Sequence, residues 1–552
     1  MNAAWIANCL WKQSAKGDWR SFTSAKADLQ STQKILLKKI LKAATSTSFA
    51  DRFRLSSQMS VEEFQGAVPV TNYAEHYEKN VALIRQGSQN VLTNQPVSRL
   101  VPTTGSTGNF KLIPYTTALK KSFQRVVNTW VYDLACNFPE AFRGRSYWSV
   151  TPVVEQQYGD SEIPIGFESD EEYLSPIGRL LAKRAIVDAP RFVSGEVADT
   201  VILLTALKLI SEPRLSLISV WSPTLLLNIL NAIRTHRDDL LSALHSGSDR
   251  VVNRLESASS VQLKRNPKRA RLLEKLLDSL DSQESFAQSI WPHLSLISCW
   301  GDAGSKSYFD RLKALEPEIP IQAKGLLATE GAVSFPLGGM SGHVPAIEST
   351  FLEFLPTSNG RDVKLLDQLG EGEVYEVLIT TFGGLYRYAT GDQIKVVEIR
   401  DGLPCFEFVG RTNEIIDLVG EKVPVQVFRD VISELSEQAD ATERFWIVSP
   451  TVDSPAHYRI YISGSQGTAE VGESILKRMR DNPHFVNAEA LGQIVPPEIR
   501  VLPDSFTMQS FQSLKTDLGF QLGALKESRV EYSTRVVSRL DQLSHPLEYH
   551  SR

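Results

Sequence analysis

The chain has 552 residues, of which 42% are hydrophobic and 22% are charged, and its formal net charge is -5. This balance excludes bulk disorder, and the length predicts more than one domain because single cores stop growing near roughly 250–300 residues. The acidic charge argues against a dedicated nucleic-acid-binding protein, which needs a basic face.

The first patterned segment is helical. Leu36, Leu37, Ile40 and Leu41 recur at helical spacing among lysines and predict one apolar face. Residues 199–289 also predict several helices. Within them, the apolar stretch 215–233 is interrupted by serines, asparagines and a proline, so a buried helical segment is expected rather than a membrane span.

Short strand-like runs follow, and the carboxyl-terminal part differs in character. Turn residues separate the runs 374–381, 394–399 and 405–409, which predicts antiparallel hairpins. Two earlier runs, 147–151 and 294–300, also read as strands. Beyond Arg411 the pattern predicts helices at 423–435 and 470–480 and paired strands at 445–448 and 458–462. We therefore expect a mixed α/β protein with a large amino-terminal domain of sheets and helices, residues 1–411, and a small α+β domain, residues 412–552.

The compartment is predicted from the cysteines and from the amino terminus. The four cysteines are far apart and form no CxxC pair, which indicates free thiols rather than a zinc or disulfide scaffold. The first ten residues lack a basic region and a cleavage site, so no signal peptide is predicted. A cytoplasmic protein without membrane or nucleic-acid partners is expected.

The strongest local motif is Thr103-Thr-Gly-Ser-Thr-Gly-Asn-Phe-Lys111. Glycines let the backbone approach a phosphate, while amide N–H and hydroxyl groups form an anion-binding nest. Lys111 adds a positive charge. The motif is not a Walker A loop, and a flexible surface turn is an equal alternative on composition alone. The candidate phosphate-binding residues are Thr103, Thr104, Gly105, Ser106, Thr107 and Gly108.

Four further segments each place a charged side chain at or near a turn. Glu330 follows Thr329, and a carboxylate there suits Mg2+, which prefers one or two carboxylates plus substrate phosphates. Asp392, four residues after Tyr388, can accept hydrogen bonds from ribose hydroxyls. The planar fork of Arg411 suits ribose or phosphate oxygens. Taken alone, each of these, and Lys526 near the carboxyl terminus, is more simply a solvated or turn-stabilising side chain.

Together and in this order, the segments resemble the acyl-adenylate-forming superfamily of acyl-CoA synthetases, luciferases and peptide-synthetase adenylation domains. The segments at 111–114, 351–354, 380–388 and 420–422 are similar to the Gretchen Hagen family of acyl acid amido synthetases, over about residues 60–530. The resemblance implies the acyl-adenylate-forming fold, with a mobile carboxyl-terminal domain. It also implies ATP as co-substrate, and a carboxylic acid and an amine, such as an amino acid, as small-molecule substrates.

The same resemblance assigns roles to the candidate residues. Residues 103–107 would hold phosphates, Glu330 would bind Mg2+, and Asp392 and Arg411 would hold the ribose. Thr329 and Tyr388 belong to the Mg2+ and ribose elements. The small domain would supply the adenylation lysine: Lys526 is the first choice and Lys515 the competing one.

For three features implied by the resemblance, more than one interpretation stays open. Arg411–Asn413 is the expected hinge, although Asn413 stands where the family has aspartate. Lys422 would enter the site in one rotational state, or be a surface lysine. Val220, Trp221 and Leu225 would line the acyl pocket, or pack in the core.

Two other functions compete with amide formation. An acyl-CoA ligase, or an adenylating enzyme that loads a carrier thiol, would share the first step and differ only in the acceptor. A binding protein with this fold and no chemistry is the third alternative. The presence of Lys111, Glu330, Asp392 and Arg411 together argues against it.

Overall fold

The computed structural model describes residues 3–103, 111–149, 161–166, 181, 183–187, 198–247, 264–280, 285–302, 305–357, 362–411, 415–416, 418, 421, 423–438, 444–451, 456–465, 468–490, 494–518 and 529–547. These residues form two compact units. Unit 1 comprises Met1–Thr103 and Lys111–Gly410, and unit 2 is described from Arg411 onward. Within the described ranges, no helix has the length and apolar character needed to cross a membrane.

Unit 1 opens with helices, and the predicted apolar stripe is confirmed. Leu36, Leu37, Ile40 and Leu41 are all buried on one face of α2. The helices of this region are α1 (Ala3–Ala25), α2 (Leu29–Ala44), α3 (Ser48–Phe53), α4 (Val61–Ala67), α5 (Tyr73–His76) and α6 (Glu78–Arg85).

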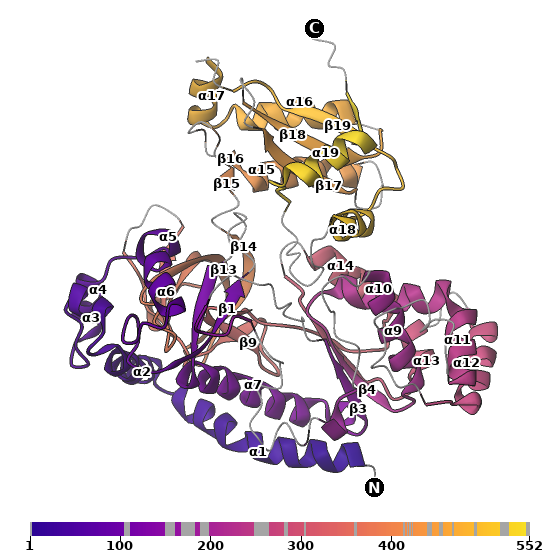
Figure 1. Ribbon diagram of the computed structural model, residues 1–552, viewed down its shortest axis with the longest axis horizontal. Coiled ribbons are helices and arrows are strands. Elements are labelled where there is room, and N and C mark those ends of the chain that lie inside the picture. The colour runs from indigo at the N-terminus through magenta and orange to yellow at the C-terminus, as the bar shows by residue number, and fades with distance from the viewer. Residues whose placement is uncertain are drawn as a thin grey trace. The chain divides into compact units, whose positions relative to one another are not determined.

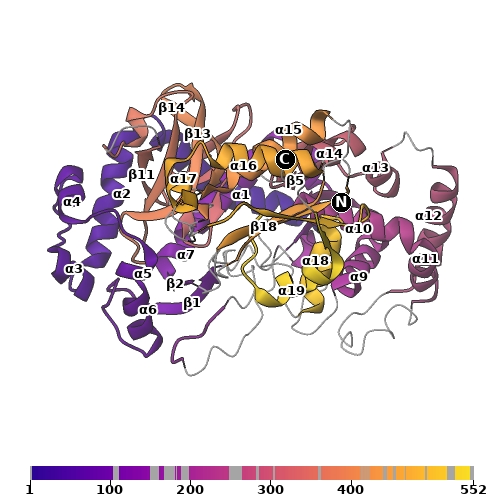
Figure 2. The same ribbon diagram turned by 90° about the horizontal axis from the view of Figure 1, so that it is seen from above.

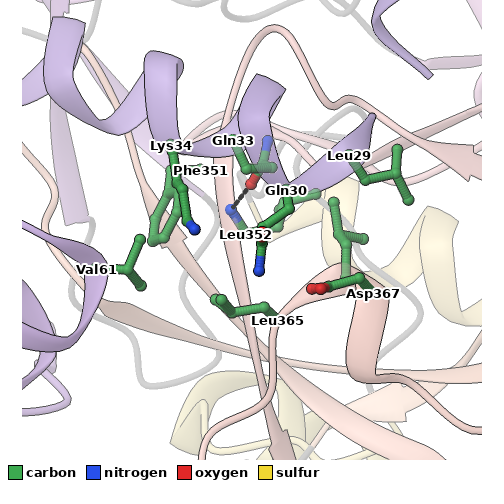
Figure 3. Close-up of a pocket in the computed structure, with 10 residues that line it drawn as sticks. Leu29, Gln30, Gln33, Lys34, Val61, Phe351, Leu352, Leu365 and Asp367 are labelled. Carbon is green, nitrogen blue, oxygen red and sulfur yellow. Dashed lines mark hydrogen bonds between the residues drawn. The ribbon is translucent and has the colours of Figure 1, made fainter. Parts of the chain in front are cut away.

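The side chain of Gln33 ties α2 to the neighbouring strand β11 (Phe351–Pro356). Its amide nitrogen donates to the carbonyls of Ile347 and Thr350 at 2.7 and 3.0 Å, and its oxygen accepts from the Leu352 N–H at 2.8 Å. Figure 3 shows this contact beside a small surface pocket between α2 and the strand. None of the candidate site residues lines that pocket.

The predicted hairpins form an antiparallel sheet in the order β11-β12-β13-β14-β10-β9. Strand β13 is longer than the expected 394–399 because it begins at Tyr388 and includes the candidate ribose segment. A separate hairpin, β1-β2, pairs Thr103 with Lys111. The strands are β1 (Val97–Thr103), β2 (Lys111–Thr116), β9 (Ser334–Pro336), β10 (His343–Pro345), β12 (Val374–Thr380), β13 (Tyr388–Arg400) and β14 (Leu403–Arg411).

A second, parallel sheet in unit 1 has the order β3-β4-β5-β6. The expectation of helix over 215–233 is wrong for its first part, because Leu215–Ser219 is strand β4. A strand covered on both faces reads as a continuous apolar run, which periodicity alone does not distinguish from buried helix. The strands are β3 (Arg145–Trp148), β4 (Leu215–Ser219), β5 (Leu296–Cys299) and β6 (Ile321–Ala323).

Helices surround this parallel sheet and separate its strands in the chain. Figure 1 shows α11 and α12 side by side, and Figure 2 shows the same pair from above. Helices α1 and α7 also pack together within unit 1. The helices are α7 (Thr117–Asn137), η1 (Pro139–Phe142), α9 (Ala198–Ser211), α10 (Pro223–Thr235), α11 (Arg237–Ser246), α12 (Pro267–Ser279), α13 (Phe286–Ile290) and α14 (Lys306–Leu315).

Unit 2 is a small α+β body built on the sheet β17-β18-β19-β20. The expected pairing of the first two strands is confirmed, with Trp446 opposite Ile462. The helix predicted from Pro424 begins at Val425, after the short strand β16. The elements are β15 (Ile415–Ile416), β16 (Val423–Pro424), α15 (Val425–Gln438), β17 (Trp446–Thr451), β18 (His457–Ser463), α16 (Thr468–Met479), α17 (Pro483–Ala490), β19 (Glu498–Leu502), α18 (Met508–Asp517), α19 (Thr534–Leu543) and β20 (His545–Pro546).

Candidate active site

Lys111 begins strand β2, opposite Thr103 at the end of β1. Its ammonium donates to the Tyr388 hydroxyl at 3.1 Å and lies 5.9 Å from the ring centroid of Tyr73. The Tyr73 hydroxyl donates to the Leu112 carbonyl and accepts from the Leu112 N–H, at 3.1 and 2.9 Å. Lys111 is therefore held beside Tyr388. The other residues of the candidate phosphate loop, Thr104–Gly108, lie outside the described residues.

Tyr388 is the residue around which several predicted groups meet. Burial and the nearby carboxylates of Glu330 and Asp392 raise the pKa of Tyr388 far above its ordinary value. The phenol therefore stays protonated at neutral pH, and its oxygen accepts from Lys111. Four candidate residues from three separate segments of the chain, Lys111, Glu330, and Tyr388 with Asp392, are thus gathered in unit 1.

Glu330 lies in the tight turn between β7 (Leu327–Ala328) and β8 (Gly331–Ala332). The Tyr115 hydroxyl, from strand β2, donates to the Thr329 carbonyl at 2.8 Å and holds this turn beside β2. Among the described residues, no group of three histidine, cysteine or acidic side chains is placed to hold a metal ion. A single carboxylate in a turn fits Mg2+ of the kind that takes most of its ligands from substrate phosphates and water.

A bulge in strand β13 directs Asp392. The pairing of β12 with β13 shifts register between Glu376 and Leu378, and Gly391 has a φ of 76°. Such positive φ favours glycine, and an extra residue in a strand re-aims the side chains around it. The Thr390 hydroxyl donates to the Val377 carbonyl at 2.9 Å and accepts from the Asp392 N–H at 3.0 Å. The Thr-Gly-Asp segment therefore forms a local turn that holds Asp392 in a buried position.

Sequence reasoning did not assign a role to Arg387. Its Nε donates to both carboxylate oxygens of Glu353 at 3.0 and 3.2 Å, and its Nη1 donates to the carbonyls of Gln65 and Val68. Its backbone adopts a φ of 49°. Because Arg387 precedes Tyr388, this buried anchor fixes where β13 begins and where the tyrosine lies.

The signal for this pair was present in the resembling segments. The run 351–354 carries Glu353, and the run 380–388 carries Arg387. Charged residues are almost never fully buried unless they are paired, so an acid in one apolar strand and an arginine in another form a candidate ion pair. Nothing local to either segment specifies the partner.

The remaining predicted residues belong to the carboxyl-terminal part of the chain. Arg411 ends strand β14 and is partly exposed. Asn413, Lys422 and Lys526 lie outside the described residues. Lys515 lies on α18, where its ammonium donates to Glu531 at 2.7 Å and lies 5.4 Å from the ring centroid of Phe511.

The three residues suggested for an acyl pocket differ in their surroundings. Val220 is fully buried, and Leu225 packs against the helical core around the parallel sheet. Trp221 is 37% exposed and lies just beyond β4. Core packing therefore describes Val220 and Leu225, while Trp221 presents part of its ring to solvent.

Family profiles match most of unit 1. The GH3 family N-terminal domain matches residues 19–321, and the GH3 family central domain matches residues 343–411. The first match alone spans more than half of the 552 residues. The chain belongs to the GH3 family. Membership confirms the resemblance inferred from the motifs.

Named GH3 relatives match over most of the chain. The indole-3-acetic acid-amido synthetase GH3.4 of Arabidopsis thaliana is 21% identical over 545 residues, covering 93% of this chain and 91% of that protein. The jasmonoyl--L-amino acid synthetase GH3.5 of Oryza sativa subsp. japonica is 21% identical, covering 74% and 75%. Among solved structures, GH3.15 acyl acid amido synthetase has a TM-score of 0.76 at 19% identity, with 96% of each chain covered. This likeness confirms the predicted mixed α/β fold.

Proposed function

We propose that this GH3 protein is an acyl acid amido synthetase. It uses ATP to convert a carboxylic acid into an acyl-adenylate, releasing pyrophosphate, and then transfers the acyl group to an amine of an amino acid, forming an amide and AMP. The observation that carries the proposal is the meeting of Lys111, Glu330 and Asp392 around Tyr388 in unit 1.

In the first step the substrate carboxylate attacks the α-phosphorus of ATP in line, and pyrophosphate leaves. The protein contributes positioning and charge stabilisation rather than a covalent intermediate. The Thr103–Lys111 loop holds the phosphates through amide, hydroxyl and ammonium donors. Asp392, aimed by the Thr390–Gly391 bulge, and Arg411 bind the ribose hydroxyls.

Mg2+, bound through Glu330 and phosphate oxygens, would supply electrostatic stabilisation of the charge on the phosphates. Tyr388, near Glu330, has a different role. Because Tyr388 stays protonated, its oxygen holds the Lys111 ammonium without adding a negative charge beside the phosphates. Tyr388 therefore positions this cation at the proposed nucleotide site.

The second step needs the amine to attack the adenylate carbonyl as AMP departs.

We assign the adenylation lysine to Lys526 rather than Lys515, because Lys515 is 85% buried by side chain and already pairs with Glu531. Residues 411–413 serve as the hinge that exchanges the groups presented to the adenylate, and Lys422 enters with the small domain. Hinges of this kind turn on a few residues at element ends.

The test is carboxylate-dependent ATP–pyrophosphate exchange over a library of carboxylic acids, followed by mass spectrometry of the products. Exchange that depends on an acid and on Mg2+, with an amide formed from an amino-acid pool, is the expected result. Glu330→Gln is expected to lower exchange by about 100-fold, while Glu348→Gln, which removes a carboxylate elsewhere in unit 1, leaves it unchanged. A thioester formed with CoA in place of an amide would reassign the acceptor, and absence of exchange with every acid would remove the proposal.

A further inference from the structure

A buried lysine surrounded by tryptophans has no role in the site described so far. Lys324 directly follows β6 and is only 4% exposed. Its ammonium donates to the Ser219 hydroxyl at 2.8 Å. It lies 4.6, 5.3 and 5.7 Å from the ring centroids of Trp221, Trp130 and Trp148. A cation within about 6 Å of a tryptophan face is attracted by the ring, so this ammonium is held by three rings and a hydroxyl.

The parallel sheet explains why these residues meet. Trp148 ends β3, Ser219 ends β4, Cys299 ends β5, and Lys324 follows β6. The Lys324 N–H donates to the Cys299 carbonyl at 2.9 Å, which continues the pairing of β5 with β6. All of these side chains therefore stand at the carboxyl ends of neighbouring parallel strands. That edge is where open α/β sheets bind their ligands.

The aromatic residues around Lys324 differ in exposure. Trp130, on α7, is 3% exposed, and its indole N–H donates to Gln322 at 2.9 Å. Trp221 is 37% exposed and is the ring nearest to the ammonium. Trp221 is therefore the part of this cage around Lys324 that solvent reaches most.

The cage lysine and Glu330 are close to each other in the chain. Glu330 is the sixth residue after Lys324, and even a fully extended segment of that length spans only about 20 Å. An acid whose reacting carboxylate lies on the Glu330 side of the cage would have its other end toward the tryptophans.

We propose that Lys324, Ser219 and the surrounding tryptophans select the acid substrate. The selected acid has a planar, π-bearing body and a second anionic or hydrogen-bond-accepting group remote from its reacting carboxylate. The rings match a planar body, and the ammonium and hydroxyl match the acceptor. The inference rests on the proposed amido synthetase function, because it names the substrate class of that reaction.

The physical reason for selection is the buried ammonium. A site built to hydrogen-bond a substrate group rejects analogues that lack it, because a bound apolar group screens the site's polar atoms without pairing them. A methyl or isopropyl group against Lys324 is therefore disfavoured. Replacing the lysine with an apolar side chain of similar length reverses the preference.

The experiment measures binding by quenching of tryptophan fluorescence, without ATP. The probes are pairs of benzoate and phenylacetate acids that carry, in the meta or para position, either a carboxylate or the similarly shaped isopropyl group. Wild-type protein is expected to bind the carboxylate member of at least one pair about 10-fold more tightly. Lys324→Met is expected to abolish or invert that preference. No preference in any pair, or a preference that Lys324→Met leaves intact, would overturn the proposal.

Two further variants keep the test decisive. Lys12→Met removes an ammonium that lies 5.6 Å from the Tyr132 ring, so it controls for loss of a cation–π lysine elsewhere in unit 1. It should leave the preference unchanged. If Lys324→Met fails to fold, Trp221→Ala acts at a partly exposed wall of the same cage and is expected to weaken binding of the preferred acid about 10-fold. Unaltered binding by that variant would count against the cage.

The same proteins separate this inference from the proposed function. Exchange assays with the probe pairs report kcat and KM for each acid. If acids support exchange but Lys324→Met lowers all of them equally, the lysine does not select the acid, and the amido synthetase proposal is unaffected. If Lys324-dependent binding is found but no acid supports exchange, the cage binds a planar acid and the proposed reaction is wrong.

Discussion

The six-stranded antiparallel sheet and the four-stranded parallel sheet of unit 1 each lie beside a buried cation, but they hold it in different ways. In the antiparallel sheet, Arg387 donates to both oxygens of Glu353 and to two backbone carbonyls. In the parallel sheet, Lys324 lies against tryptophan faces and donates to Ser219. The arginine fork is matched by oxygen acceptors from two segments of the chain. The Lys324 ammonium is surrounded mainly by aromatic rings.

The difference indicates different purposes. A buried ion pair is costly to break, because removing one member leaves an uncompensated charge in the core. Arg387 and Glu353 therefore stabilise the region that positions Tyr388. A lysine held by aromatic rings keeps an ammonium at the ligand-binding edge of a sheet, where a substrate group can meet it.

The largest expected effect is on stability, from breaking the Arg387–Glu353 pair. Glu353→Gln keeps the shape of the side chain but removes the charge that Arg387 faces, and should lower the free energy of unfolding by about 3 kcal/mol. Urea denaturation followed by fluorescence measures this loss. Glu373→Gln is the matched control, since Glu373 pairs with Lys364 at 3.0 Å on the surface, with side-chain exposures of 52% and 33%. Its expected loss is under about 1 kcal/mol. Equal losses in the two variants would show that Arg387 is not an anchor.

The contrast also explains what the sequence can and cannot predict. The α2 stripe is predictable because its period is local, and the hairpins of β12, β13 and β14 are predictable because turn residues separate them. The Arg387–Glu353 pair joins residues 34 apart, and Arg387 reaches the Gln65 and Val68 carbonyls across more than 300 residues. No local pattern encodes such partners.

The candidate active site likewise has features that the sequence predicts and features that it does not. Motifs in a known order identify Lys111, Glu330 and Asp392, because each chemistry needs its residue type beside a turn. Their meeting at Tyr388 depends on how the β1-β2 hairpin packs beside β13, which no motif contains. The cage around Lys324 is less predictable still, since its members come from helix α7 and from the ends of separate strands that the parallel register brings together.

An intermediate effect is expected at Tyr388, and it acts on catalysis. Tyr388→Phe removes the acceptor for the Lys111 ammonium and should lower kcat/KM for ATP in the exchange assay by about 10-fold, the value of one hydrogen bond to a charged group. Tyr375→Phe is the control, because Tyr375 is also buried in the antiparallel sheet but accepts from Lys364 and Gly370 instead. Similar losses in both variants would mean that the effect comes from the sheet and not from Lys111.

The smallest expected effect is on the reactivity of the buried cysteines, one in each of the two sheets. Burial raises the pKa of Cys299, beside Lys324, to about 12 and that of Cys405, in the antiparallel sheet, to about 11. Both thiols are therefore protonated at pH 8 and shielded from a disulfide reagent, whereas Cys9 and Cys136 are exposed.

Rapid labelling of Cys9 and Cys136 alone is the expected outcome at pH 8, with all four thiols reacting in guanidinium. Peptide mapping by mass spectrometry identifies the labelled sites. If the cage opens toward Trp221 to admit an acid, Cys299 should be labelled slowly in the free protein and more slowly still with a bound acid, while Cys405 does not change. Labelling of Cys299 at the rate of Cys9 would show that the carboxyl-terminal edge of the parallel sheet is not closed around Lys324. Equal protection of Cys299 and Cys405 by the acid would instead show that the acid stabilises the whole protein.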